Sequence, residues 1–385
     1  MIRHLPVGRS LRTVLFLLLT LAAGQAARAS DPVIGADIAA GRLHSWECAS
    51  GERLGEAVMP GPLTAGPVVD PAAGRVYGAA GVALQSYSLP DLALAAQRRL
   101  EAPATHLALG RGAGGVLLVA GRVDVATGSP AQRPTLTAHR PDDLAPAHAW
   151  NLSTAGEVTA LLAVQDRRRF VLGFARHDEM WEIAWDPDAP PVLRGLVHDY
   201  RNSEAVPLPG RFTERAFKVP RATRALVAGG MPYEVLQVDR EGAGGIVNLD
   251  IRRRTEPVAV QGVRFITAWR GPQGRGWLVF HEDGRITRVS SPDARQQAWG
   301  RLMAAPIDVV ALPDGSGALV LEGTGEGGHL QGGRLRHLGA LADTLTEGPA
   351  VAGAHRLSLS SAATCVAVVD VQGRWLSSQT VGTAR

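Results

Sequence analysis

Residues 105–121 read THLALGRGAGGVLLVAG. Two apolar segments of strand length flank the glycine-rich turn GRGAGG, and a histidine, His106, stands at the start of the first segment. Short apolar runs bounded by glycine are typical of β-strands that are buried in a sheet. A single hairpin cannot bury its own apolar side chains, so its fold depends on whether the rest of the chain supplies similar neighbours.

The same unit recurs along the chain as an apolar strand, a turn rich in Gly, Asp or Arg, and a second apolar strand. The other clear copies are GPVVDPAAGRVYGAA (66–80), VTALLAVQDRRRFVLGFA (158–175), RAFKVPRATRALVAGG (215–230), FITAWRGPQGRGWLVFH (265–281), IDVVALPDGSGALVLEG (307–323) and HRLSLSSAATCVAVVD (355–370). Successive copies start roughly 40–55 residues apart, which is close to the blade period of β-propellers. A weaker copy lies at 34–58. The sequence therefore predicts an all-β chain folded as a β-propeller with eight blades, with seven as the alternative.

The N-terminal segment has the pattern of a Sec-type secretory signal peptide. Three arginines precede the apolar run of residues 14–21, and Ala-Arg-Ala at 27–29 provides a cleavage site of small residues. The run is short for a membrane span. We therefore expect residues 1–29 to be removed on export to the periplasm and residues 30–385 to form one propeller domain without a membrane span. A retained N-terminal anchor is the alternative.

The charge balance argues against nucleic-acid binding. The formal charge of the chain is +4, but its first 29 residues hold four arginines and no acidic residue, so the remainder is near neutral. A nucleic-acid-binding protein usually carries a clear excess of positive charge. Lys218 is the only lysine, so we expect any anionic ligand to be held by arginine guanidinium groups.

Two cysteines lie near opposite ends of the chain, Cys48 in the first unit and Cys365 in the last. These units are neighbours in a closed ring, so a disulfide there would close a loop of about 300 residues and stabilise the fold by up to ~4–5 kcal/mol. Two buried thiols are the alternative. The absence of a CxxCH motif excludes a covalent c-type haem, and no CxxC or HExxH motif indicates a zinc site.

Four histidines lie next to predicted strand ends or loops. His106 opens its unit, His177 follows the second strand of the fourth unit, and His198 opens the long non-repetitive stretch 196–214 between the fourth and fifth units. Long loops on rigid scaffolds are often functional. His281 ends a second strand and is interpreted as a solvated turn residue. The other three are candidates for a site where neighbouring blades meet at the channel.

The segment 105–122, THLALGRGAGGVLLVAGR, resembles a segment of cytochrome d1 propeller domains in which a histidine precedes a strand, a glycine turn, a second strand and Gly-Arg. The segment 170–190, FVLGFARHDEMWEIAWDPDAP, is similar to a second one of that family, with a histidine in the turn between two strands. FHEDGRITRVS (280–290) and PIDVVALPDGSGALVLEG (306–323) resemble its later blades.

This resemblance implies an eight-bladed propeller with haem d1 lying across its channel. It implies that His106 is the axial ligand of the haem iron and that His177 is a distal donor. We expect His198, from the long non-repetitive stretch, to support His177, and either histidine to be a candidate general base. The resemblance also implies that Arg122 and Arg176, which lie close to His106 and His177 in the sequence, bind the haem carboxylates, because guanidinium groups bind carboxylates through two parallel hydrogen bonds.

Two departures from that family shape the functional hypothesis. Its nitrite reductases carry an N-terminal c-type haem domain, which this sequence lacks, and a second distal histidine, in whose place Phe217 and Lys218 stand. The sequence thus favours a periplasmic propeller that binds haem d1 or its tetrapyrrole precursor during cofactor maturation or delivery for denitrification. Its expected partners are nitrite reductase or other maturation proteins. One alternative is a redox enzyme of the d1 type with a separate electron donor; another is a cofactor-free protein-interaction propeller.

Overall fold

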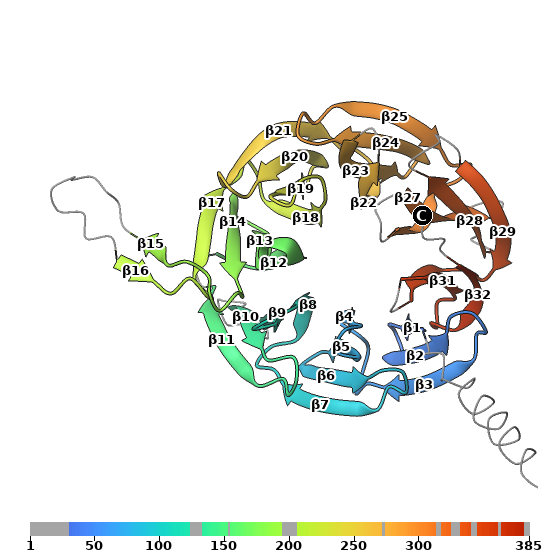
Figure 1. Cartoon of the computed structure of the whole chain (residues 1–385), viewed down its shortest axis with the longest axis horizontal. Helices are drawn as coiled ribbons and strands as arrows, with labels where there is room; N and C mark the ends of the chain where they lie inside the picture. Colours follow the sequence, from blue (N-terminus) through green and yellow to red (C-terminus); the bar gives the residue numbers. More distant parts are fainter. Residues whose placement is uncertain are drawn as a thin grey trace, which may run out of the picture.

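The computed structural model describes residues 31–123, 133–152, 155–194, 206–271, 274–312, 317–324, 332–339, 345–360 and 363–380. These residues form antiparallel sheets arranged as eight blades around a ring, with one separate hairpin and one short 3-10 helix, η1 (Gln165–Arg167) (Figure 1). The prediction of an all-β propeller with eight blades is therefore confirmed. Among the described residues there is no helix with the length and apolar character that a membrane crossing needs.

Each blade is built from strands that are consecutive in space, with its first strand at the channel and its last at the rim (Figure 1). The first four blades are β1 (Pro32–Asp37), β2 (Arg42–Glu47) and β3 (Arg53–Val58); β4 (Ala65–Asp70), β5 (Arg75–Ala80), β6 (Ala83–Ser88) and β7 (Leu94–Arg99); β8 (Ala104–Gly110), β9 (Val116–Val123), β10 (Arg133–His139) and β11 (Pro146–Asn151); and β12 (Val158–Val164), β13 (Arg169–Phe174), β14 (Glu179–Ala184) and β17 (Glu214–Lys218). The last four are β18 (Thr223–Ala228), β19 (Glu234–Asp239), β20 (Ala243–Asn248) and β21 (Arg253–Ala259); β22 (Val263–Gly271), β23 (Gly274–His281), β24 (Arg285–Ser290) and β25 (Gln296–Arg301); β26 (Pro306–Ala311), β27 (Gly317–Thr324), β28 (Gly332–Gly339) and β29 (Leu345–Ala352); and β30 (Arg356–Leu359), β31 (Cys365–Val369) and β32 (Trp375–Thr380).

Burial differs systematically between the strands of a blade. The second strand is the most buried: every residue of β19 is buried, and so is every residue of β5 and β13 after the first. The rim strands β7 and β25 are mostly exposed. A second strand has a neighbouring blade on each face, so it needs a continuous apolar run rather than alternating polarity. This is why the apolar runs were the clearest repeat signal in the sequence.

Tryptophan side chains connect neighbouring blades across the sheet interfaces. A buried indole contributes a large apolar ring to the packing, but its N–H needs an acceptor. Four indole Nε1–H groups of the described residues donate to a backbone carbonyl of the adjacent blade: Trp185 to Arg111, Trp277 to Val227 and Trp46 to Gly373, each at 3.1 Å, and Trp150 to Phe212 at 2.8 Å. Packing is tight enough that a Cβ added to Gly110 would lie 2.4 Å from the Trp185 ring, so glycine is required at position 110.

Within the described residues, the first and eighth blades close the ring without exchanging a strand. A disulfide joins Cys48, which follows β2, to Cys365 at the start of β31, with 6.2 Å between their Cα atoms. Ser358 Oγ also donates to the carbonyl of Ile34 across this junction at 2.8 Å. Of the two alternatives for these cysteines, the structure shows the disulfide.

The repeat predicted at 215–230 is wrong in its first strand. Residues 214–218 form β17, the rim strand of the fourth blade, and the fifth blade begins with β18. An insertion separates β14 from β17 and carries a hairpin, β15 (Val192–Arg194) and β16 (Val206–Leu208), that projects away from the ring (Figure 1). The long non-repetitive stretch therefore lies within the fourth blade, because the insertion displaced the rim strand along the sequence.

Candidate functional site

The blades repeat one antiparallel order around the ring, so the starts of the innermost strands share one face of the ring and their ends share the other. His106 lies near the start of β8. We call its side of the ring the His106 face, and we define it by residues 103–106, residues 155–157 before β12, and the turn 175–178 between β13 and β14. The strand ends meet on the opposite face.

His106 is half-buried between the innermost strands of the third and fourth blades. Its Nδ1 lies 3.0 Å from the hydroxyl of Thr105, and the backbone of Thr159 in the next blade also forms a hydrogen bond with the ring. Burial lowers the pKa of His106, while the hydrogen bond with Thr159 and the negative charge of Glu157 act in the opposite direction. The imidazole is therefore neutral at pH 7, which is the form that binds metals.

A β-bulge near the start of the innermost strand places His106, because the pairing of β8 with β9 shifts between Ala104 and His106. The innermost strands of the fourth to seventh blades show the same one-residue shift near their starts. The residues at the equivalent position there are Ala160, Ala225, Phe265 and Asp308. The bulge is thus a property of the repeat, and the imidazole is particular to the third blade.

Asp308 shows what a polar residue at this position can do for the fold. Its carboxylate accepts hydrogen bonds from the backbone N–H groups of Val309 and of Leu357 in the next blade, each at 2.9 Å. Burial raises the pKa of Asp308, while these two hydrogen bonds act in the opposite direction and lower it. His106 likewise bonds to the backbone of the following blade, so it connects two blades in addition to any role toward a ligand.

The structure brings three of the five predicted site residues to one loop. Arg122 Nη1 forms an ion pair with Glu157 Oε1 at 3.2 Å, and the same carboxylate acts on His106. A Cβ added to Gly156 would lie 3.4 Å from His177 Cδ2, so the His177 ring packs on Gly156. His106, Arg122 and His177 therefore surround residues 156–157.

The remaining predictions have different outcomes. Arg176 is exposed in the turn beside His177. His198 lies outside the described residues. His281 is not a solvated turn residue as predicted: it is 4% exposed, and its two ring nitrogens lie 2.9 Å from Gln261 O and 3.0 Å from Thr287 Oγ1. It ends β23 in a fully hydrogen-bonded position, where its role is structural.

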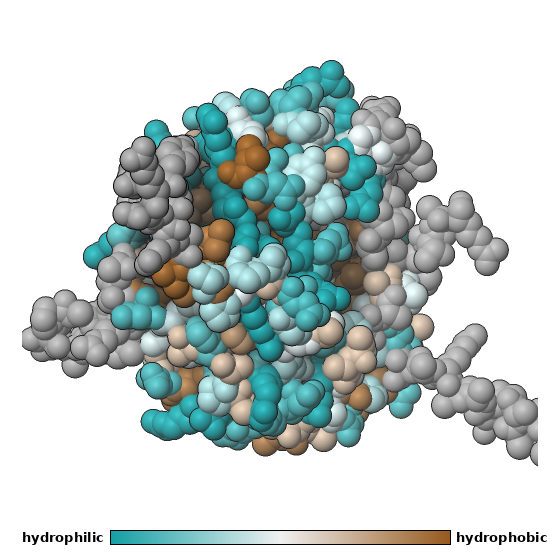
Figure 2. Space-filling view, turned by 60° about the vertical axis from the view of Figure 1, so that its left-hand side comes forward, coloured by the Kyte–Doolittle hydropathy of each residue, from teal (hydrophilic) through white to brown (hydrophobic). Residues whose placement is uncertain are grey.

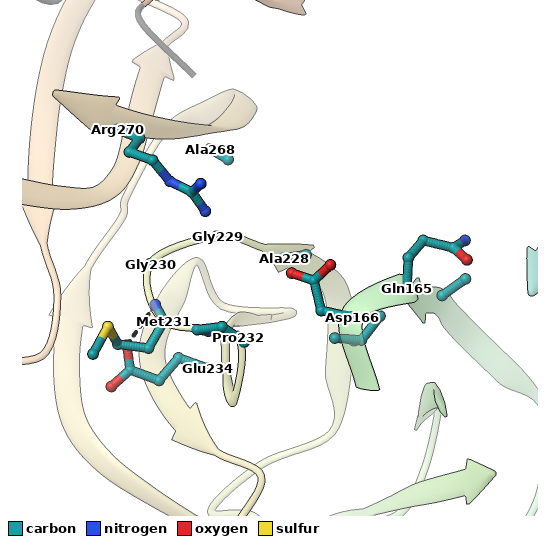
Figure 3. Close-up of a pocket in the computed structure, with 12 residues that line it drawn as sticks. Gln165, Asp166, Ala228, Gly229, Gly230, Met231, Pro232, Glu234, Ala268 and Arg270 are labelled. Atoms are coloured by element: carbon teal, nitrogen blue, oxygen red, sulfur yellow. Dashed lines mark hydrogen bonds between the residues drawn. The ribbon is translucent and has the colours of Figure 1, made fainter. Parts of the chain in front are cut away.

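The opposite face carries a pocket of about 280 Å³ where the ends of β12, β18 and β22 meet (Figure 3). Arg270 and Asp166 point toward its opening from different blades, and the backbone of Gly229 and Gly230 lies between them (Figure 3). Glu234 is buried beneath and accepts a hydrogen bond from the N–H of Met231 at 3.3 Å. Groups of opposite charge at one small opening suit a ligand that carries both charges.

Sequence reasoning missed the loop 156–157, this pocket and a group of arginines between the fourth and fifth blades. The arginine group had a signal in the sequence: two Arg-Arg-Arg runs, at 167–169 and 252–254, which extend from a strand-connecting turn into the following strand in neighbouring blades. The loop and the pocket had none, because glycine and alanine backbone positions form much of both.

Fold and site together define the class of protein: an eight-bladed β-propeller with a neutral imidazole and two further charged or titratable groups gathered on one face of its channel. Sequence comparison adds no family, since no model of a known protein family matches the chain and no curated protein matches it.

Comparison with solved structures shows the fold at low sequence identity. A dihydro-haem d1 dehydrogenase, NirN, in complex with DHE is similar with a TM-score of 0.64 and 14% identity, covering 92% of this chain and 74% of that one. BamB from Moraxella catarrhalis has a TM-score of 0.57 and 10% identity over 90% and 94% of the two chains. The computationally designed protein Ika8 has a TM-score of 0.58 and 13% identity over 92% and 95%. The chain is therefore similar in fold to a d1-type propeller and to propellers of other kinds.

Acidification from pH 7.5 to 5.5 should destabilise the protein. Burial lowers the pKa of His44, His106, His139 and His148. The unfolded chain, in which these groups titrate near 6.5, then binds more protons than the folded chain, so the free energy of unfolding falls as the pH falls through this range. Urea unfolding midpoints at the two pH values measure the effect. A midpoint that stays constant or rises on acidification would contradict it.

Proposed function

We propose that this protein binds a tetrapyrrole of the haem d1 class, or its precursor, at the His106 face, and acts in the maturation or delivery of that cofactor. One observation carries the proposal: a half-buried neutral imidazole lies on the innermost strand of a fold whose neighbours include a dihydro-haem d1 dehydrogenase solved in complex with DHE. A bound haem would supply an iron, and the neutral imidazole of His106 would be the group that holds it.

The residues of the His106 face fit such a group in part. His106 fits in charge and burial, and its Nδ1 already has a protein partner, as metal-ligating imidazoles usually do. Arg122 does not fit the predicted carboxylate clamp, because it is already paired with Glu157, whose charge would repel a haem carboxylate. In our proposal Arg122 therefore positions residues 156–157, and exposed Arg176 binds a carboxylate of the ligand.

His177 is proposed as a polar group on the ligand side of the same face, since its ring packs on Gly156 next to the Arg122–Glu157 pair. Its contribution would be to donate or accept a proton at a ligand atom, as a histidine in the turn between two strands is placed to do. We also propose that His198, which lies outside the described residues, supports His177 in this role.

A periplasmic location is also part of the proposal. The disulfide between Cys48 and Cys365 supports it, because structural disulfides persist in oxidising compartments. The signal peptide expected at residues 1–29 lies outside the described residues.

Spectral titration of the purified protein with haem d1 tests the proposal. We expect the Soret and visible bands to shift on binding to the wild type, and we expect H106A to lose the shift because the axial nitrogen is gone. The matched control is H355A, which removes an exposed histidine in the eighth blade and should bind as the wild type does. No shift in the wild type, or equal shifts in H106A and H355A, would overturn the assignment.

A cofactor-free interaction propeller is the second candidate, and the projecting hairpin favours it. Leu193 on β15 is 68% exposed and Val206 on β16 is 57% exposed. Figure 2, which turns the side bearing this hairpin forward, shows a mostly hydrophilic surface interrupted by apolar patches. Exposed apolar side chains on a projecting element are typical of contacts with another protein. This candidate predicts that haem d1 produces no spectral shift.

A further inference from the structure

Four arginines gather where the fourth and fifth blades meet, on the face opposite to His106. Arg167 belongs to η1, Arg169 to the start of β13, Arg215 to β17, and Arg252 to the turn before β21. One buried carboxylate stands among them: Glu182 on β14, with an exposed fraction of 0%. Arg169 Nη1 and Arg252 Nε each lie 3.1 Å from Glu182 Oε2, and Arg167 Nη2 lies 3.8 Å from Glu182 Oε1.

The acidic groups of this cluster do not balance its cations. Arg167 is paired with Asp250 at 2.7 Å, and Glu182 is the carboxylate paired with Arg169 and Arg252. Four guanidinium groups thus face two carboxylates, which leaves an excess of two positive charges. Glu214, the neighbour of Arg215 on β17, also lines the pocket described next, and its charge acts on His148 of the third blade as well. It offsets at most one of the two excess charges, so the group remains cationic.

Arg215 is the arginine of this group without an ion pair in the described part of the chain. It lies opposite Glu182 in the register of β14 and β17, yet its guanidinium group donates from Nη2 to the carbonyl of Pro190, at 3.5 Å. Burial and the charges of Arg169, Arg252 and Arg167 lower the pKa of Arg215, with only Glu182 acting in the opposite direction. A half-buried cation repelled by its neighbours is an unfavourable arrangement unless an anion joins it.

A pocket of about 610 Å³ opens beside this cation. It is lined by Arg215 and Arg252 together with Glu214, by the small side chain of Ala216, and by Val192 and Leu193 of β15. Among the described residues, the fourth blade is the only blade that carries such a hairpin, and the hairpin lies beside the arginine group. One wall of the pocket is thus cationic and another is apolar.

We propose that this pocket, which we call the Arg215 pocket, binds a small organic oxyanion: a phosphate or carboxylate head group held by Arg215 and Arg252, with an apolar portion against Val192 and Leu193. Guanidinium groups bind such oxyanions through paired hydrogen bonds. Arg252 uses its Nε toward Glu182, so the terminal nitrogens of its fork remain for the ligand. The site lies on the other face of the ring from His106, so its test is independent of the proposed tetrapyrrole site.

Isothermal titration calorimetry at low ionic strength tests the proposal with phenyl phosphate, phenylacetate and inorganic phosphate as probes. We expect phenyl phosphate or phenylacetate to bind the wild type more tightly than inorganic phosphate does, because only these two carry an apolar portion. The two aromatic probes distinguish a phosphate from a carboxylate head group. We expect R215Q to weaken binding of the preferred probe at least tenfold, and added salt to weaken it in the wild type.

The matched control is R301Q, which removes an exposed arginine from the rim strand of the sixth blade and should leave binding unchanged. The proposal is overturned if no probe binds the wild type, or if R215Q and R301Q bind the preferred probe equally.

Thermal unfolding without added anions separates a binding role from a structural one. Removal of Arg215 relieves repulsion, so we expect the midpoint of R215Q to equal or exceed that of R301Q. R169Q, which loses a partner of Glu182, should unfold at a lower temperature. A midpoint of R215Q as low as that of R169Q would mark Arg215 as structural and overturn the proposal.

Discussion

The double variant C48S/C365S should lose about 4 kcal/mol of its free energy of unfolding, because the disulfide joins residues 317 positions apart in the sequence. A crosslink across so long a loop removes many conformations from the unfolded chain. The effect has a structural consequence in this ring. In the part of the chain that the structure describes, the first and eighth blades share no strand and otherwise meet through side-chain packing and isolated hydrogen bonds such as Trp46 Nε1 to Gly373 O.

Denaturant unfolding of the oxidised wild type, the reduced wild type and the double variant measures this contribution. The reduced wild type should resemble the double variant, because both lack the crosslink and differ only in two thiol groups. A loss below about 1 kcal/mol would contradict the prediction and would mean that packing at the junction alone closes the ring.

The fold was predictable because the repeat carries its own signal. Each second strand is enclosed by neighbouring blades, so its residues must be apolar without interruption, as in 116–120 of β9. The prediction failed only where the insertion after β14 moved the rim strand β17 away from its sheet in the sequence. A strand of five residues with mixed polarity, ERAFK, has no periodicity strong enough to reveal which blade it joins.

The candidate site was less predictable, because its partners come from different blades. Position 106 could be singled out as a histidine at a strand start, but Glu157, which pairs with Arg122 and acts on His106, is 35 residues from Arg122 in the sequence. Pairing of charges between blades depends on the side-chain geometry of the folded ring, which no local pattern encodes. His281 illustrates the converse: its place after a strand predicted solvation, and hydrogen bonds to Gln261 and Thr287 instead bury it.

Substitution of the buried carboxylate in E182Q should lower the free energy of unfolding by about 3–5 kcal/mol, because it leaves neighbouring guanidinium groups without their counter-charge in a buried place. Glu182 is fully buried and is the shared partner of Arg167, Arg169 and Arg252. The variant keeps the shape of the side chain, so the loss reports charge rather than a cavity.

The matched control is E241Q, which removes a carboxylate paired with Arg221 at 3.2 Å where both side chains are largely exposed. An exposed pair contributes ~1 kcal/mol or less, so E241Q should unfold close to the wild type. Urea unfolding of both variants gives the comparison, and similar losses would contradict the prediction. The further variant E182Q/R169Q should recover part of the loss, since it removes one of the unpaired cations. Such recovery would show that repulsion among the arginines, and not the lost hydrogen bonds alone, destabilises the junction of the fourth and fifth blades.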